Sequence, residues 1–265
     1  MPELREAAPG GPLQMADGKA RRIAFVVMVA FFALGPLVIY PVFLMKVMCF
    51  ALFACAFNLL LGYVGLLSFG HAMFLGIAGY TAAHAAKEWG LTPELAILCG
   101  AAAASVLGLA SGLIAIRRQG IYFAMITLAL AQMVYFFCVQ APFTHGEDGI
   151  QAVPRGRLLG VIDLSNVAAM YVTVFAIFIA GFLLVYRIIH SPFGQVLKAI
   201  RENEARATSL GYDTDRYKLI AYVISATLSG LAGATNALVF QLAALNAVHW
   251  TMSGEVVLKI GRAHV

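Results

Sequence analysis

Long apolar runs whose interiors carry no Asp, Glu, Lys or Arg limit what this chain can fold into more than any other feature. A bilayer core of about 30 Å requires about 20 apolar residues per helix, because backbone groups in lipid can bond only to one another. The sequence therefore predicts an all-α, polytopic membrane protein with about seven transmembrane helices. The runs that meet this requirement lie at about 23–45, 47–66, 72–86, 94–116, 120–140, 166–186 and 218–240.

The third run is the shortest, and its start is rich in small and polar residues. Gly65, Ser68, Gly70 and His71 precede or open it. This pattern favours a broken or tilted helix that lines a cavity, because irregular backbone at membrane depth needs protein or water around it.

Basic residues predict the orientation. With the N-terminus in the cytoplasm, twelve Lys and Arg side chains fall on the cytoplasmic side, while Lys46, Lys87, Arg155 and Arg157 fall outside. Cytoplasmic loops carry this excess in membrane proteins. Because the basic residues stand mostly at the ends of apolar runs, the net charge of +5 does not indicate a nucleic-acid partner.

Two further patterns concern the N-terminal tail and helix packing. Residues 1–22 are rich in Gly, Pro and Ala and lack periodicity, which predicts a disordered cytoplasmic tail. Small residues recur at helical spacing in 108–112 and 230–234, which predicts close helix packing in lipid.

The sequence offers little support for chemistry of its own. It has no phosphate-binding loop, no H-E-x-x-H and no G-x-S-x-G, so we assign no catalytic residue, metal site or cofactor. The interiors of the apolar runs lack the ionisable residues that coupled carriers use as relays. A transport protein of this kind is a passive channel or draws its energy from a partner.

The connection between the sixth and seventh runs predicts one short surface helix. Ser191 is suited to the N-cap, Pro192 to the first helical position, and Gly211 to the C-terminal stop. Leu197, Ile200, Glu204 and Ala207 recur at helical spacing, with charged residues around them. A solvated connector is the alternative.

This connection resembles the cytoplasmic loop of ATP-binding-cassette (ABC) importer permeases, which docks on the ATPase subunit. The match runs through Glu204-Ala205-Arg206, with Gly211 one residue further on than usual. Three longer stretches, 58–74, 117–132 and 220–234, resemble the branched-chain amino-acid ABC transporter permease family of the LivM type. The segment 144–149 matches it too, except that His145 replaces a glycine.

The resemblance covers about residues 30–258 and implies a permease transmembrane domain over 23–258. It implies the bacterial plasma (inner) membrane as location, and branched-chain amino acids or related solutes such as urea and short amides as cargo. The implied partners are a second homologous permease subunit, two cytoplasmic ABC ATPase subunits, an extracytoplasmic solute-binding protein and membrane lipid. The implied ATPase-coupling residues are Arg201, Glu202, Asn203, Glu204, Arg206 and Gly211.

Two further sets of residues are predicted to contact the solute or its carrier. Polar residues within apolar runs are candidates for the translocation path, or else for bonds between helices: Asn58, Ser68, His71, Thr127 and Gln132. The external loop of about 141–165 is expected to dock the binding protein, or else to be a solvated connector, and its candidates are Thr144, Glu147, Asp148 and Arg155.

The C-terminal end departs from the family pattern after Leu258. Residues 259–265 resemble the translation of a sequencing adapter, so we expect this heptapeptide to be non-native and the transmembrane domain to be incomplete. For the function, a passive channel or secondary carrier is the rival within transport. A membrane-embedded enzyme is the rival outside it, without a convergent catalytic set to support it.

Overall fold

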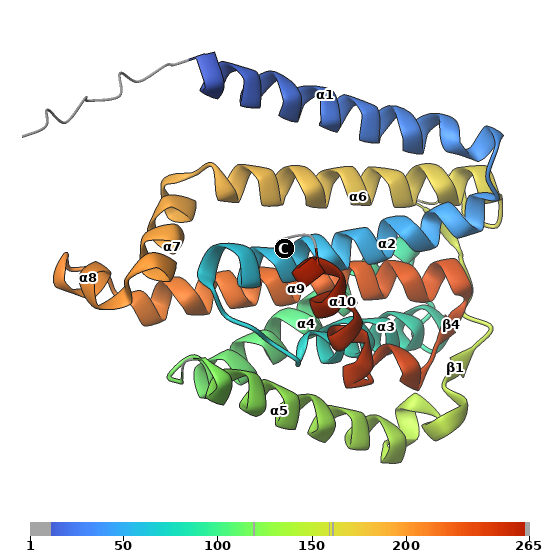
Figure 1. Ribbon diagram of the computed structural model, residues 1–265. Coiled ribbons are helices and arrows are strands. Elements are labelled where there is room, and N and C mark those ends of the chain that lie inside the picture. The colour runs from blue at the N-terminus through green and yellow to red at the C-terminus, as the bar shows by residue number, and fades with distance from the viewer. Residues whose placement is uncertain (1–11, 119, 159, 161, 263–265) are drawn as a thin grey trace, which may run out of the picture. The chain divides into compact units, whose positions relative to one another are not determined.

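The computed structural model describes residues 12–118, 120–158, 160 and 162–262, and most of them are helical (Figure 1). The chain forms two compact units, Met1–Leu44 and Met45–Val265. The described α-helices are α1 (Pro12–Leu34), α2 (Pro41–Asn58), α3 (His71–Lys87), α4 (Pro93–Ala115), α5 (Ile121–Gln140), α6 (Val167–Ile189), α7 (Pro192–Glu202), α8 (Glu204–Ser209), α9 (Thr214–Phe240) and α10 (Trp250–Arg262).

Short elements complete the chain. A π-helix, η2 (Leu59–Val64), continues α2, and the 3₁₀ turns are η1 (Gly35–Leu37), η3 (Pro142–Thr144), η4 (Gly146–Asp148) and η5 (Leu245–Ala247). Among the described residues, four two-residue strands form two antiparallel pairs: β1 (Ile150–Gln151) with β4 (Leu242–Ala243), and β2 (Arg157–Leu158) with β3 (Ile162–Asp163).

The first unit differs from the sequence prediction in two ways. Helix α1 begins at Pro12, so residues 12–22 are helical, whereas residues 1–11 lie outside the described part. The predicted span 23–45 is divided, because Pro36 lacks a backbone N–H and turns the chain into η1 before α2 begins at Pro41. A residue mix of Gln, Met, Ala, Lys and Arg over 12–22 favours continued helix.

In the described part of the chain, five helices are long and apolar enough to cross a membrane: Pro41–Val64, Pro93–Ala115, Ile121–Gln140, Val167–Ile189 and Thr214–Phe240. They correspond to five of the seven predicted runs. Helix α3 has 17 residues and follows a non-helical stretch in which Gly65 has a φ of +80°. Helix α3 itself is unbroken; the break lies in residues 65–70 before it, where the small and polar residues stand.

Helices α3, α4 and α9 pack against one another and form the core of the second unit. Small residues bring their backbones together: a Cβ on Gly108 of α4 would stand 2.6 Å from Ala226 Cβ of α9, and one on Gly100 would stand 2.6 Å from the Ala78 carbonyl oxygen of α3. A Cβ on Gly230 would overlap Ala104. The predicted packing role of 108–112 and 230–234 is confirmed.

The second unit has two distinct ends, and Figure 1 shows α7 and α8 at one and β1 and β4 at the other. At the first end, the Arg201 guanidinium donates a hydrogen bond to the Gly62 carbonyl oxygen. At the second, Lys87 Nζ donates to the Gln151 carbonyl oxygen at 3.0 Å. Arg201 and Lys87, which were assigned to opposite sides of the membrane, thus lie at opposite ends of the second unit. These ends are called the coupling end and the loop end below.

The packing of α9 on α3 can be tested by a substitution at Gly233. A Cβ at this position would overlap the Leu75 carbonyl oxygen, so Gly233→Ala is expected to destabilise the fold by about 1–3 kcal/mol and lower the thermal midpoint in detergent. Gly254→Ala is the matched control, because its nearest neighbour is the Trp250 ring at 3.8 Å. Equal midpoints for the two variants would contradict this packing.

Candidate functional site

The segment 191–211, named the coupling segment here, is anchored by caps and by apolar packing. Ser191 Oγ accepts a hydrogen bond from the Gly194 N–H at 3.4 Å, which confirms Ser191 as the N-cap of α7. Leu197, Ile200 and Ala207 are buried. The Phe193 ring stacks on Tyr217 of α9 at a centroid distance of 5.5 Å.

The prediction of one helix in this segment was wrong, since two helices meet at Asn203. This residue has an extended backbone (φ −158°, ψ 97°), and its side chain caps α8 by accepting from the Arg206 N–H at 2.9 Å. The Asn203 side chain thus forms a local cap that competes with a continuous helix. Gly211, with φ +90°, ends the segment where it was predicted.

Glu204 has an internal partner that the sequence pattern did not reveal. Its carboxylate pairs with the ammonium of Lys218, whose side chain is 3% exposed, and accepts from Thr214 Oγ1 at 3.3 Å. The ion pair joins α8 to the first turns of α9. Breaking a buried pair leaves an uncompensated charge, so Glu204 stabilises the junction between the coupling segment and the bundle.

The remaining predicted coupling residues from α7 to α8 are exposed, and they differ in whether their side chains bond to the bundle. Arg201 is exposed but bonds to Gly62, as described above, while Glu202, Asn203 and Arg206 are exposed. Leu210 beside them is a large apolar side chain that is 70% exposed. The exposed surface from the end of α7 to the residue after α8 thus offers two charges of opposite sign, Glu202 and Arg206, and one apolar contact, Leu210.

Three of the five predicted path residues gather around the start of α3. Ser68, His71 and Thr127 are completely buried. Thr127 Oγ1 accepts from the Phe69 N–H at 3.3 Å, and His71 Nε2 lies 2.9 Å from Ser225 Oγ of α9. These contacts are hydrogen bonds between elements of the bundle, which is the alternative reading of these residues.

Asn58 and Gln132 lie apart from that cluster. Asn58 ends α2, and its Oδ1 is buried without a hydrogen-bond partner next to Gly62. Gln132 is half-buried on α5. Among the described residues, no three His, Cys, Asp or Glu side chains gather in a way that could hold a metal ion.

The external loop is structured, and two of its predicted docking residues have internal roles. Thr144 is completely buried, and its Oγ1 donates toward the Cys138 and Ala141 carbonyl oxygens at the end of α5. Arg155 Nη2 donates to the Val239 carbonyl oxygen of α9 at 2.8 Å. Glu147 and Asp148 in η4 are exposed and available to a partner.

A short hairpin in the same loop carries two residues of opposite charge. Arg157 and Asp163 face one another in the β2–β3 pair. The Ser165 N–H donates to Asp163 Oδ1 at 2.9 Å, and this hydrogen bond lowers the pKa of the Asp163 carboxyl. Asp163 therefore stays ionised well below neutral pH.

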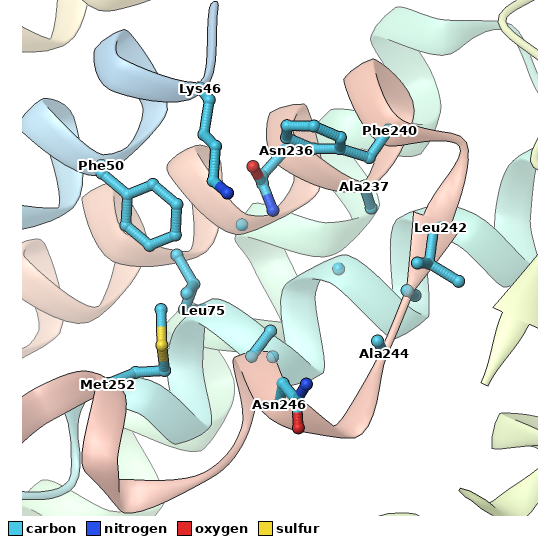
Figure 2. A pocket seen from close by; sticks show the side chains of 15 residues that line it. Lys46, Phe50, Leu75, Asn236, Ala237, Phe240, Leu242, Ala244, Asn246 and Met252 are labelled. Atoms are coloured by element: carbon cyan, nitrogen blue, oxygen red, sulfur yellow. The ribbon is translucent and has the colours of Figure 1, made fainter. Parts of the chain in front are cut away.

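A cavity of about 280 Å³ lies at the loop end, and the sequence prediction missed its polar lining (Figure 2). Lys46 of α2, Asn236 of α9 and Asn246 of η5 contribute polar groups. The rest of the lining comes from apolar side chains and from glycines of α3 and α9. Asn236 is a polar residue within an apolar run, which is the same criterion by which the five path residues were predicted.

The buried bundle, its long apolar helices with few charged residues and the cavity between them are those of a polytopic helical membrane protein, and they fit the transport class. The model of the family described as "branched-chain amino acid transport system / permease component" matches residues 39–263, and the chain belongs to that family.

Two curated relatives carry the name "high-affinity branched-chain amino acid transport system permease protein LivM". The one from Escherichia coli (strain K12) is 26% identical over 210 residues, and the one from Salmonella typhimurium (strain LT2) is 28% identical over 213. Each alignment covers 70% of this chain and 49% of the relative, so the chain spans about half their length. No solved structure matches.

The Glu204–Lys218 pair can be tested by a double-mutant cycle. Glu204→Gln leaves the buried Lys218 ammonium without its counter-charge and is expected to cost about 3–5 kcal/mol. Adding Lys218→Met removes the stranded charge, so the double variant should recover most of the thermal stability in detergent. Additive losses in the double variant would show that the two residues do not interact.

Proposed function

We propose that the chain is a membrane-spanning permease subunit of an ABC importer in the bacterial inner membrane, with branched-chain amino acids or chemically related small solutes as cargo. Its partners are then a second permease subunit, two cytoplasmic ATPase subunits that hydrolyse ATP, and an extracytoplasmic solute-binding protein. Family membership supports the transport class. The names of the LivM relatives support the solute class.

The observation that carries the proposal is the two-sided character of the coupling segment. One side is fixed to the bundle through Leu197, Ile200 and the Glu204–Lys218 pair. The other side exposes Glu202, Arg206 and Leu210. A segment that only connected two helices would need neither the buried ion pair nor an exposed leucine, whereas a docking element needs a rigid base and a free surface.

The ATPase contact is tested best at residues without an internal role. Glu204→Lys is unsuitable, because it would place a second ammonium beside Lys218 and unfold the junction. Arg206→Glu changes an exposed charge instead and should reduce ATP-driven uptake at least tenfold while insertion and stability stay unchanged.

Arg118→Glu is the matched control, since Arg118 is also exposed and lies in the turn between α4 and α5. Uptake is measured in vesicles with the binding protein and ATP supplied. If Arg206→Glu transports as fast as Arg118→Glu, the coupling segment is not the ATPase contact.

The external loop is proposed to dock the binding protein through Glu147 and Asp148, whose carboxylates are exposed. The double reversal Glu147→Lys with Asp148→Lys should raise the binding-protein concentration needed for half-maximal uptake about tenfold or more. Glu88→Lys, an exposed reversal at the C-cap of α3, is the control. A shift of the same size in both variants would mean that the loop acts only through its net charge.

A further inference from the structure

The cavity at the loop end has one charged group, and that group lacks an acidic partner. Of the residues that line the cavity, Lys46 alone is charged. Among the described residues no carboxylate pairs with it; its ammonium stands 5.6 Å from the centre of the Phe240 ring. An ammonium at the mouth of an apolar cavity attracts a carboxylate.

A second polar group in the cavity lacks a partner as well. Asn236 Oδ1 is buried and accepts no hydrogen bond, which is costly for a carbonyl oxygen in an apolar setting. Figure 2 shows Lys46 and Asn236 pointing toward one another on one side of the cavity, with Asn246 across from them. Asn236 Oδ1 is therefore placed to accept a hydrogen bond from a donor bound next to Lys46.

The remaining lining is largely apolar, and three glycines belong to it: Gly76 and Gly79 of α3 and Gly233 of α9. A Cβ on Gly76 would overlap Val248 and one on Gly233 would overlap the Leu75 carbonyl oxygen, so these glycines let the walls of the cavity pack closely. Leu75 and Met252 form part of the apolar wall. The volume of about 280 Å³ is near the lower end of the range of about 300–1,000 Å³ for small-molecule pockets, so the cavity suits a solute of amino-acid size.

From these groups we infer that the cavity is a low-affinity binding site, within one permease chain, for a zwitterionic α-amino acid with an aliphatic side chain. Lys46 meets the carboxylate, Asn236 Oδ1 accepts from the ammonium, and the side chain lies against Leu75 and Met252. The physiological meaning of this site rests on the proposed function. Asn246 and Leu242 at the cavity are exposed at the loop end, which is the end where the solute would arrive.

The site is tested by binding to the full chain in nanodiscs of phosphatidylcholine, which excludes anionic lipid as a competitor for Lys46. Saturation-transfer-difference NMR detects weak ligands, and leucine is the probe. Leucine methyl signals are expected with the wild-type chain. Isovalerate, which keeps the carboxylate, should bind more weakly than leucine, and isoamylamine, which lacks the carboxylate, should give no signal.

Variants locate the site. Lys46→Met should weaken leucine binding about tenfold or more, because a charge-assisted contact is lost. Lys87→Met is the matched control, since Lys87 is at the same end but outside the cavity, and it should bind like wild type. Ala244→Leu fills the cavity from the short segment between β4 and η5 rather than from the bundle core, and it should abolish the signal with an unchanged elution profile.

Equal leucine signals from wild type and Lys46→Met, or isoamylamine signals as strong as those of leucine, would overturn the assignment. Failure of the proposed function has a different signature, because uptake by the assembled importer does not enter this assay. Leucine binding in the cavity without ATP-driven uptake would support the binding site and contradict the importer function. Uptake without any leucine binding to the chain would support the importer function and overturn the binding site.

Discussion

The close approach of α3, α4 and α9 is the constraint on which the rest of the structure depends. Without side chains at Gly100, Gly108 and Gly233, the backbones pack at distances that no larger residue permits. In lipid this contact replaces the hydrophobic effect, which cannot drive apolar helices together there. Gly233 also lines the loop-end cavity, so the contact between α3 and α9 that stabilises the core forms part of the cavity wall.

Helix α9 joins the two ends of the second unit through polar contacts. At the coupling end, its buried Lys218 pairs with Glu204 of α8. At the loop end, its Val239 carbonyl oxygen accepts from Arg155, and Asn236 faces the cavity. A force applied to the coupling segment by a partner therefore acts on the helix that lines the cavity. Such an arrangement provides a physical route between ATP hydrolysis outside the chain and solute movement through it, within the proposed function.

The sequence predicted what depends on local chemistry and composition. Apolar length located the helices, Ser191 and Gly211 set the limits of the coupling segment, and the small residues of 108–112 identified a packing face. The sequence also contains a helix break at Pro36 and a cap at Asn203, but each stands inside a longer apolar or helical pattern that predicts a continuous helix.

Tertiary partners could not be predicted, because nothing local specifies them. Lys218 lies 14 residues from Glu204, Val239 lies 84 residues from Arg155, and Ser225 lies 154 residues from His71. Glu204, Arg155 and His71 therefore have partners within the protein, although the sequence pattern predicted contacts with a solute or a partner protein. The cavity likewise needs α2, α3, α9 and η5 together, which no single motif describes.

Under the proposed function, this chain moves solute only when a partner supplies energy. This dependence can be measured as the accumulation ratio of labelled leucine in proteoliposomes that contain the chain, its permease and ATPase partners and the binding protein. We expect accumulation above the external concentration with ATP at the ATPase side, and no leucine entry with a non-hydrolysable analogue. Equilibration to a ratio of one without ATP hydrolysis would contradict this dependence and identify a passive channel.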